Sequence, residues 1–401
     1  MKGRDIIMVG QQAWDTEIGS NCRNIALEFS KQNRVLYVNS ALDRITKLRY
    51  ANDSKVQKRL KVIQGKQTGL ERVSENLWVY YPDRIIESIN WIRPHWLFRV
   101  LNRRNNFRFA SSIQTAISEL GLKDFILFND SDMFRSFYLK ELLKPSTTLY
   151  YSRDNMMATD YYKRHGKYLE PEIIKKSDLC VANSVYLQQY CKSFNERSFY
   201  VGQGCELGLF QEPSIQMPKE LERIPSPIIG YVGALTSARL DIALLEYLST
   251  SLPKLSFVLV GPEDEQFKRS RLHRLENVYF LGSKPTEDLP RYIQAFDVCI
   301  NPQTLNDLTI GNYPRKIDEY LALGKPVVAT RTDTMEAFSD FTYLATTKKE
   351  FFEKIMIALS DSDPEAQFKR KEFAFSHSWD NSVNLIIEEI VKVEALKSVA
   401  L

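Results

Sequence analysis

Residues 314–330 read PRKIDEYLALGKPVVAT, a helix-like segment followed by a glycine turn and a short apolar run. Proline suits the first turn of a helix, because its missing N–H would have no partner there. Lys316 and Glu319 are three residues apart, so they share one face of this helix. The segment predicts a helix over 314–323 whose first turn carries a cation and a carboxylate, with a buried strand over 326–329 behind it.

This pairing of charges has two interpretations. In the first, Lys316 and the free N–H groups of the helix start bind an anion, while Glu319 accepts hydrogen bonds from two neighbouring hydroxyls, as on a ribose. In the second, the two residues form an ordinary i,i+3 salt bridge on a solvated face. The surrounding segments are needed to choose between them.

Strand-like and helix-like segments alternate along most of the chain. This alternation predicts an α/β protein with parallel, doubly wound sheets. The proline-rich stretch 211–227 separates two series of strands, so we expect two domains, 1–210 and 211–380, with a helix over 381–401 as a candidate to pack back on the first. The predicted strands are 6–9, 34–38, 77–80, 125–128, 148–151, 179–182 and 199–201 in the first series, and 228–232, 256–260, 278–281, 298–300 and 326–329 in the second.

Composition favours a soluble globular protein. Of the 401 residues, 44% are hydrophobic and 26% are charged, and no run approaches the roughly 18 apolar residues of a membrane span. The apolar core of residues 1–10 is too short for a signal peptide, so we expect a cytoplasmic protein. The five cysteines and four histidines are scattered, which argues against a zinc site or a disulfide framework.

Positive charge is concentrated in one part of the chain. Residues 44–110 hold 15 Lys and Arg against 5 Asp and Glu, while the rest of the chain holds 39 against 45. Within this part, 91–109 interleaves tryptophan and phenylalanine with arginine, which suits an anionic membrane surface or a lipid-diphosphate acceptor. A core helix with a solvated basic face is the alternative. No nucleic-acid motif accompanies the charge.

The loops after the second series of strands are suited to a ligand. In GYVGALTSARLD (230–241), Gly233 permits close backbone approach and Arg239 precedes the next helix, although an ordinary tight turn has the same composition. A later strand ends in Gly282, Ser283 and Lys284. The third glycine of a dinucleotide fingerprint is missing after Gly233, which argues against a nicotinamide oxidoreductase.

The order of these motifs resembles the donor-binding half of GT-B glycosyltransferases. The likeness is closest to the retaining family-4 group, and within it to enzymes of the teichuronic-acid type, in which P-x-K-x-x-E-Y-L-A-x-G-K-P-V-V is typical. Three stretches of the first half, 149–158, 177–187 and 201–210, are similar to further motifs of the group. The pattern is matched at Pro314, Lys316, Glu319, Tyr320, Leu321, Ala322, Gly324, Lys325, Pro326, Val327 and Val328.

The resemblance implies a GT-B fold, with two Rossmann-like domains facing a central cleft. It implies that a nucleotide-sugar, with UDP or GDP as the nucleotide, is bound by the second domain without a cofactor or metal. By resemblance, Glu319 holds the ribose and Arg239 and Lys316 neutralise the diphosphate. Further donor contacts are expected from Gly233, Gly282, Lys284, Tyr313 and Arg315.

The chain departs from the family pattern at the hinge, where Cys205 and Glu206 replace a small apolar residue and Asp, and at one position of the donor half. Many family-4 enzymes have a second glutamate eight positions before the ribose glutamate, where this chain has Gly311. Contacts to the donor sugar must then come from Asn306, Asp307, Thr309 or backbone amides.

The acceptor side is expected in the first domain. Gly19, Ser20 and Asn21 follow the first strand and are candidates to offer amides to the diphosphate or the acceptor, although a plain strand–helix loop reads the same way. Asp154 is the candidate catalytic carboxylate for the acceptor hydroxyl, and a helix N-cap is the alternative. In retaining GT-B enzymes the donor phosphate can itself take that proton, which would leave Asp154 to orient the acceptor. Asp130-x-Asp132 ends a strand away from the expected diphosphate site, so no metal is expected.

Together these features predict a retaining glycosyltransferase. It would move a sugar from a nucleotide-sugar to a hydroxyl of a glycan or lipid-linked acceptor in bacterial envelope or exopolysaccharide assembly, at the inner face of the cytoplasmic membrane. A GT-B-like nucleotide- or glycan-binding protein without catalysis is the alternative that Gly311 leaves open.

Overall fold

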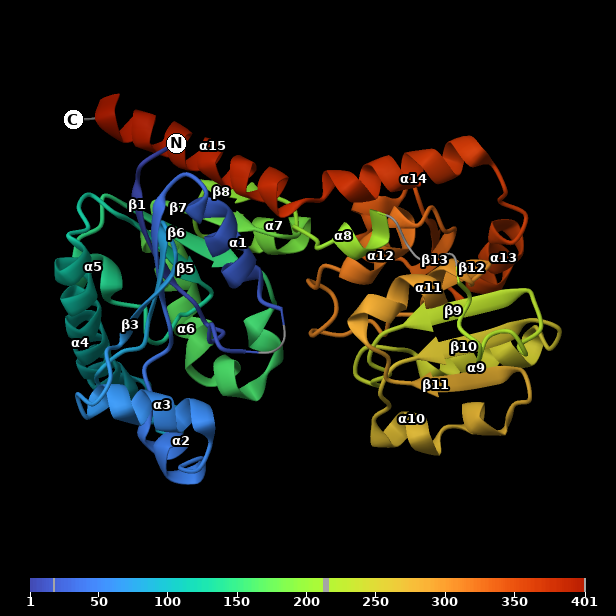
Figure 1. Cartoon of the computed structure of the whole chain (residues 1–401), viewed down its shortest axis with the longest axis horizontal. Coiled ribbons are helices and arrows are strands. Elements are labelled where there is room, and N and C mark those ends of the chain that lie inside the picture. Colours follow the sequence, from blue (N-terminus) through green and yellow to red (C-terminus); the bar gives the residue numbers. More distant parts are fainter. Residues whose placement is uncertain (17–18, 212–215, 400–401) are drawn as a thin grey trace. The chain divides into compact units, whose positions relative to one another are not determined.

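The computed structural model describes residues 1–16, 19–211 and 216–399 (Figure 1). Part of the predicted 211–227 stretch and the end of the predicted C-terminal helix lie outside these residues.

Packing divides the chain into two compact units. The N-terminal unit comprises Met1–Gly202 and Ser382–Leu401, and the C-terminal unit comprises Gln203–Asn381. The chain therefore enters the C-terminal unit once and returns, so both ends of the sequence belong to one unit. The acceptor and donor roles expected for the two domains stay predictions.

The described residues of the N-terminal unit form an eight-stranded sheet. Its strand order is β3-β4-β2-β1-β5-β6-β7-β8, with β3 antiparallel to β4 and the other pairs parallel. The central strands are buried along their whole length, as expected for parallel strands covered on both faces. The strands are β1 (Asp5–Val9), β2 (Arg34–Val38), β3 (Leu70–Ser74), β4 (Leu77–Tyr80), β5 (Ile126–Asp130), β6 (Thr147–Ser152), β7 (Leu179–Ala182) and β8 (Ser198–Tyr200).

Helices of this unit connect the strands. The longest, α4, ends at Gly121, whose φ of 59° is the left-handed conformation that favours glycine at a helix end. The helices are α1 (Asn21–Ser30), α2 (Arg44–Arg49), α3 (Ser54–Ile63), α4 (His95–Leu120), α5 (Leu139–Leu143), η1 (Met156–Ala158), α6 (Asp160–Lys176) and α7 (Val185–Lys192).

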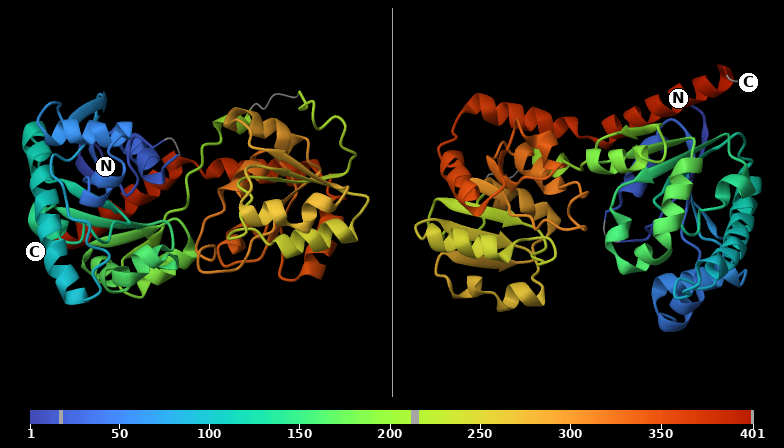
Figure 2. Two further views of the ribbon diagram at one scale, coloured as in Figure 1. Left: turned by 90° about the horizontal axis from the view of Figure 1, so that it is seen from below. Right: turned by 180° about the vertical axis from the view of Figure 1, so that it is seen from behind.

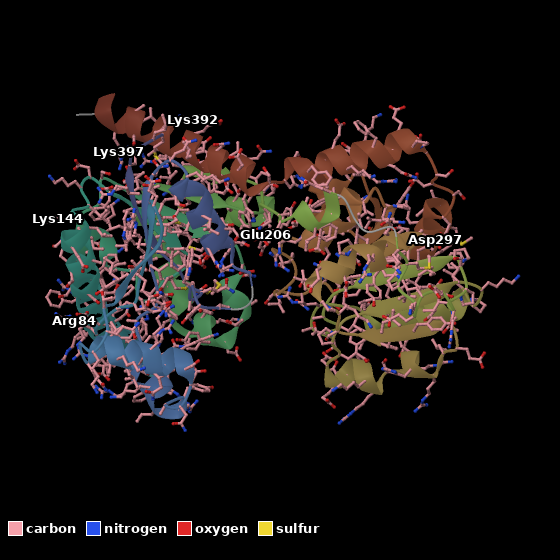
Figure 3. The ribbon with its side chains drawn as sticks, viewed as in Figure 1. Arg84, Lys144, Glu206, Asp297, Lys392 and Lys397 are labelled. Atoms are coloured by element: carbon pink, nitrogen blue, oxygen red, sulfur yellow. The ribbon has the colours of Figure 1, made fainter. Side chains whose placement is uncertain are left out.

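Helix α15 (Trp379–Val399) brings the C-terminal segment back along the N-terminal unit (Figures 1 and 2). Arg4 is 2.8 Å from Glu394, and the Ser382 hydroxyl donates to the Val201 carbonyl at 2.9 Å. Lys397, labelled in Figure 3, is 3.0 Å from Asp178, which precedes β7. These contacts tie the helix to the start of the chain and to the sheet.

The C-terminal unit has a six-stranded parallel sheet among its described residues, in the order β11-β10-β9-β12-β13-β14. Side chains alternate between two cores, one on each face of the sheet. Ile228 and Val232 of β9 face the core that contains α12, while Ile229 and Tyr231 face the core that contains α9. The strands are β9 (Ile228–Val232), β10 (Ser256–Val260), β11 (Val278–Gly282), β12 (Val298–Asn301), β13 (Val327–Thr330) and β14 (Tyr343–Ala345).

The helices of the C-terminal unit cover both faces of this sheet. They are α8 (Gly208–Gln211), α9 (Ile242–Ser251), α10 (Glu265–Arg269), η2 (Arg271–Arg274), η3 (Thr286–Asp288), α11 (Leu289–Gln294), α12 (Arg315–Ala322), η4 (Met335–Phe338), α13 (Lys348–Ala358) and α14 (Pro364–Ser376).

Every predicted strand overlaps a strand of the structure, and two strands, β3 and β14, were not predicted. The predicted helix over 314–323 corresponds to α12, which begins at Arg315 with Pro314 as its N-cap residue. None of the helices in the described residues combines the length and apolar character needed to span a membrane.

Candidate functional site

Helix α12 is anchored to the carboxyl end of β9 by one buried tyrosine. The Val232 N–H donates to the Tyr320 hydroxyl at 2.9 Å, and Tyr320 has no exposed surface. The pairing of β9 with β12 ends at Gly230, and beyond it the side chain of α12 supplies the hydrogen-bond partner of the Val232 amide. The contact places the first turn of α12 beside the loop that follows β9.

Gly233 allows the close approach of this helix. Its φ of 143° favours glycine, and its amide donates to the Val260 carbonyl at 2.7 Å. A Cβ at this position would lie 2.1 Å from Cε and 2.3 Å from Nζ of Lys316. The Lys316 ammonium therefore rests against the bare backbone of Gly233, 5.8 Å from the ring centroid of Tyr231.

Lys316 and Glu319 are half-buried, and the structure contains no ion pair between them. Neither side chain has a hydrogen bond to any residue that the structure describes, so the salt-bridge interpretation is wrong. Burial raises the pKa of Glu319, although Lys316 and Arg315 oppose this, and burial lowers the pKa of Lys316. Burying a charge without a direct partner is unfavourable, which is typical of groups that await a ligand.

Two arginines add positive charge around Lys316. Arg239, in the loop after β9, and Arg315, the first residue of α12, are exposed and make no ion pair within the described part of the chain. Both contribute to lowering the pKa of Lys316, so both are near it. Three cations beside a helix N-terminus suit an anion of more than one charge, and the neighbouring carboxylate suits hydroxyl groups.

The loop that carries Arg239 is held in place by a second loop, between β12 and α12. The Thr304 N–H donates to the Arg239 carbonyl at 2.9 Å, and Nδ2 of Asn306 donates to the Ala238 carbonyl at 2.8 Å. The Asn306 Oδ1 accepts from the N–H groups of Leu308 and Thr309 at 2.9 and 3.1 Å. Asn306 therefore shapes the loop.

The other predicted sugar contacts lie on the same loop. Thr309 is buried, and its hydroxyl bonds to the Thr304 carbonyl, whereas Asp307 is exposed. Their contacts to a donor sugar stay predictions, as does the consequence of the buried Gly311.

The remaining predicted donor contacts are more dispersed. Gly282 is exposed with a φ of 66° and open space around it. The Lys284 ammonium is 2.6 Å from Glu220 and lies 5.5 Å from the ring centroid of Tyr292, so its charge has a partner. The side chain of Tyr313 is buried, and its hydroxyl is 3.1 Å from Nδ1 of His377. The Tyr313 carbonyl accepts from the Arg315 N–H at 3.1 Å, and the phosphate contact expected of Tyr313 stays a prediction.

A buried polar cluster on the other side of α12 was missed by the sequence reasoning. Asp318 is fully buried, with its carboxylate 2.6 Å from Nδ1 of His377 and accepting from the Cys205 thiol at 3.1 Å. The three residues are far apart in sequence, so no local pattern pointed to them. They fix the orientation of the helix that carries Lys316 and Glu319.

In the N-terminal unit, the predicted loop residues lie at the start of α1. The Ser20 hydroxyl accepts from the Arg23 N–H at the limit of a hydrogen bond, 3.5 Å, which makes Ser20 the N-cap residue. Nδ2 of Asn21 donates to the Tyr151 hydroxyl at 3.3 Å, and Gly19 is exposed. The Ser20 side chain therefore acts as the cap of an ordinary helix start, and the amide contacts expected of residues 19–21 stay predictions.

Arg153 joins two carboxylates that the sequence analysis treated separately. Its guanidinium is 2.8 Å from Asp130 and 2.9 Å from Asp154. Nearby charges from both aspartates outweigh burial and raise the pKa of Arg153. Asp154 is about half exposed and is not the N-cap of α6, which is Thr159.

The two aspartates of the D-x-D motif have separate partners. Asp130 binds Arg153, and Asp132 is 2.7 Å from Arg135. Across the residues described, no group of three or more His, Cys, Asp or Glu side chains is arranged to hold a metal ion.

Comparisons with known proteins point in the same direction as the geometry. Residues 226–361 match the family model described as Glycosyl transferases group 1. The protein TuaH of Bacillus subtilis (strain 168), whose name assigns it to teichuronic acid biosynthesis as a glycosyltransferase, is 28% identical over 190 residues. That match covers 44% of this chain and 46% of TuaH, so the chain spans about half the length of this relative.

Solved structures resemble the whole chain. Sucrose-phosphate synthase from Thermosynechococcus elongatus has a TM-score of 0.64 at 15% identity, covering 98% of this chain and all of that one. HepE of Anabaena in complex with UDP has a TM-score of 0.64 at 14% identity, covering 97% and 99%. OtsA has a TM-score of 0.67 at 12% identity, covering 96% and 99%. The chain has the GT-B glycosyltransferase fold, and the family resemblance seen in its sequence is confirmed.

Proposed function

We propose that this chain is a retaining, metal-independent glycosyltransferase that moves a sugar from a UDP- or GDP-sugar to a hydroxyl of a glycan or lipid-linked acceptor in envelope or exopolysaccharide biosynthesis. The observation that carries the proposal is the pair of half-buried, unpartnered charges at the start of α12, Lys316 and Glu319. They lie in the segment that matches the group 1 family model. The cytoplasmic side of the membrane is the proposed location.

The charges around α12 suit the leaving group of such a reaction. As the bond to the sugar breaks, negative charge builds on the departing diphosphate, and fixed cations and N–H groups stabilise it. Lys316 and Arg239 would bind the diphosphate, with the Arg315 side chain and the positive end of α12 beside them. Glu319 would accept hydrogen bonds from the two ribose hydroxyls, which would neutralise part of the penalty for its burial.

The acceptor hydroxyl must lose a proton during transfer. Asp154 is the proposed group for orienting this hydroxyl, and the donor phosphate is the alternative proton acceptor. Arg153 holds Asp154 in place through a contact at 2.9 Å. A charge-assisted hydrogen bond of this kind keeps a carboxylate in a fixed orientation.

One exposed face of α4 supports contact with a membrane. Trp96, Val100 and Phe107 are 69%, 61% and 64% exposed, and their spacing of four and seven residues places them on one face of the helix. Arg103 and Arg104 lie on or beside this face, exposed and without ion pairs in the described structure. Aromatic rings with arginines suit the interface of an anionic membrane, where a lipid-linked acceptor would be found.

Nucleotide binding tests the proposal. A panel of UDP, GDP, their sugar conjugates and NAD would be screened by thermal unfolding, since a ligand at 100 times its Kd adds about 2.7 kcal/mol to the free energy of unfolding. We expect UDP or GDP to stabilise the protein, a Glu319→Ala variant to lose most of this effect and an Asp154→Ala variant to keep it. Equal nucleotide affinity in Glu319→Ala would refute the ribose assignment, and stabilisation by NAD alone would refute the transferase.

A binding protein without catalysis is the second candidate. Gly311 replaces the glutamate found in many family-4 enzymes, and this glycine is buried in the loop before α12. Release of UDP or GDP from a nucleotide-sugar, measured over time at saturating donor, separates the two candidates. Binding without any turnover, with or without an acceptor, would favour the binding protein.

A further inference from the structure

The N-terminal unit contains a cavity of about 500 Å³. This volume lies within the roughly 300–1,000 Å³ range of small-molecule sites. None of the residues named above for donor binding lines it. The cavity is lined by residues from the segments 41–49, 86–91, 98–105, 134–135 and 160–164.

The walls of the cavity are fastened to one another before any ligand binds. The 41–49 and 86–91 segments are joined by backbone hydrogen bonds, from Arg44 N–H to the Ile86 carbonyl at 3.1 Å and from Ile86 N–H to the Leu42 carbonyl at 3.0 Å. The Asn105 side chain bonds both backbone groups of Glu87, at 2.9 and 2.8 Å. A wall held in this way loses little freedom on binding, which favours affinity.

One wall is a cluster of three aromatic rings. Phe134 stacks on Tyr162 with centroids 5.6 Å apart, and Tyr161 packs edge-on against both at 6.0 and 5.0 Å. Tyr161 is 58% exposed and Trp91, also in the lining, is 68% exposed. The neighbouring rings hold Tyr161, and Nε1 of Trp91 donates to the Ser88 carbonyl at 2.8 Å. Exposed rings held in this way offer apolar surface that suits the C–H face of a pyranose ring.

The lining also provides hydrogen-bond donors for hydroxyl groups. Arg164 donates to the Asn90 carbonyl at 3.1 Å and keeps further N–H groups, and Arg135 binds Asp132 through Nε. The Tyr161 hydroxyl has no partner within the described residues. Flat apolar rings with planar polar groups around them form a site for a sugar ring.

The cavity is connected to Asp154 by a chain of hydrogen bonds. Nε2 of Gln11 donates to the hydroxyl of Tyr162, a lining residue, at 2.7 Å, and the Gln11 N–H donates to Asp130 at 3.3 Å. Arg153 then bridges Asp130 and Asp154. The wall of the cavity is thereby linked, through Gln11, Asp130 and Arg153, to the group proposed to orient the acceptor hydroxyl.

We infer that this cavity binds a glycosyl group of the acceptor, with its ring against Tyr161 and Trp91. The identification of this sugar as part of the acceptor rests on the proposed function, whereas the lining of the cavity supports only the binding of a sugar. It assigns acceptor recognition to Tyr161, which the sequence analysis did not select, and gives a sugar-binding role to Trp91 of the 91–109 segment.

The test is calorimetric titration of the full chain with octyl glycosides below their micelle-forming concentrations. The panel comprises the glucoside, galactoside, N-acetylglucosaminide and glucuronide. We expect at least one to bind, Tyr161→Ala and Trp91→Ala each to weaken it about fivefold or more, and Tyr161→Phe to keep most of the affinity. Tyr247→Ala is the matched control, because Tyr247 is 37% exposed on α9 of the other unit.

The inference is overturned if no octyl glycoside binds, if both alanine variants bind as the parent does, or if Tyr247→Ala loses as much affinity. UDP and GDP titrations of the same variants separate this outcome from failure of the proposed function. Unchanged nucleotide affinity with weakened glycoside binding supports both. Glycoside binding without any nucleotide binding leaves the sugar site standing and refutes the transferase.

Discussion

Replacing Gly233 with alanine tests whether Lys316 binds the anion from its observed position. The new Cβ would lie 2.3 Å from Nζ of Lys316, whereas a carbon contact is normally about 3.5 Å or more. The ammonium must therefore move by about 1 Å. The flexible end of the side chain can move in this way, so we expect the protein to fold.

This displacement should weaken nucleotide binding. A hydrogen bond to a charged group contributes about 1.5–3 kcal/mol, which corresponds to a Kd for UDP or GDP about 10- to 150-fold higher. The assay is isothermal titration of the parent and the variant with the nucleotide found in the thermal screen. We also expect a loss of about 1–3 kcal/mol in stability, because alanine is strained at the φ of 143°.

Two controls isolate the role of Lys316. Gly121 also has a positive φ, 59°, but a Cβ there meets nothing within 4 Å, so Gly121→Ala should lower stability without changing the Kd. Lys316→Gln and the double variant Gly233→Ala/Lys316→Gln should bind nucleotide equally weakly, since both changes remove one contact. A parental Kd in Gly233→Ala, or additive losses in the double variant, would refute the reasoning.

Three further predictions follow from the contacts of α12 and α4. Burial raises the pKa of Glu319 above its ordinary 4.5, so ionisation of Glu319 destabilises the unliganded fold as the pH rises through this raised pKa. The Glu319→Gln variant should therefore unfold at a higher temperature than the parent at pH 7.5. This difference in unfolding temperature should shrink at pH 4, where Glu319 of the parent is protonated. An advantage that persists unchanged at pH 4 would contradict the assigned cause. Tyr320→Phe leaves the Val232 N–H without a partner, so it should lower the free energy of unfolding by about 1–3 kcal/mol, as measured by urea denaturation; an unchanged midpoint would mean that the anchor is unimportant. The double variant Arg103→Glu/Arg104→Glu should bind phosphatidylglycerol vesicles at least tenfold more weakly in a sedimentation assay, because each arginine near the surface contributes about 1 kcal/mol. The double variant Lys47→Glu/Lys61→Glu is the charge-matched control. Equal losses of vesicle binding in both variants would indicate a diffuse charge effect.

The strands of the fold were predictable because most are continuous apolar runs. The two missed strands lack this signal. Leu70–Ser74 is an edge strand that is half-buried to exposed along its length, and Tyr343–Ala345 has only three residues. Edge strands bury little apolar surface, so their composition differs little from that of loops.

The charged residues of the site were predictable from local spacing. The long-range contacts that hold their helix in place were not. Lys316 and Glu319 lie one helical turn apart, so the sequence alone places them together. The contact between Tyr320 and Val232 joins residues 88 positions apart, and Asp318 and His377 are 59 apart. Such pairs depend on how the helix packs on the sheet, which periodicity does not encode.

The packing of α15 has a consequence for the order in which the chain folds during its synthesis. Arg4 is separated from Glu394 by 390 positions in sequence, so the N-terminal unit cannot complete its contacts until Glu394 has left the ribosome. Residues 203–381 emerge earlier and can fold as a unit while the first 202 residues still lack their last helix. The C-terminal unit, although its synthesis begins later, can therefore finish folding before the N-terminal unit.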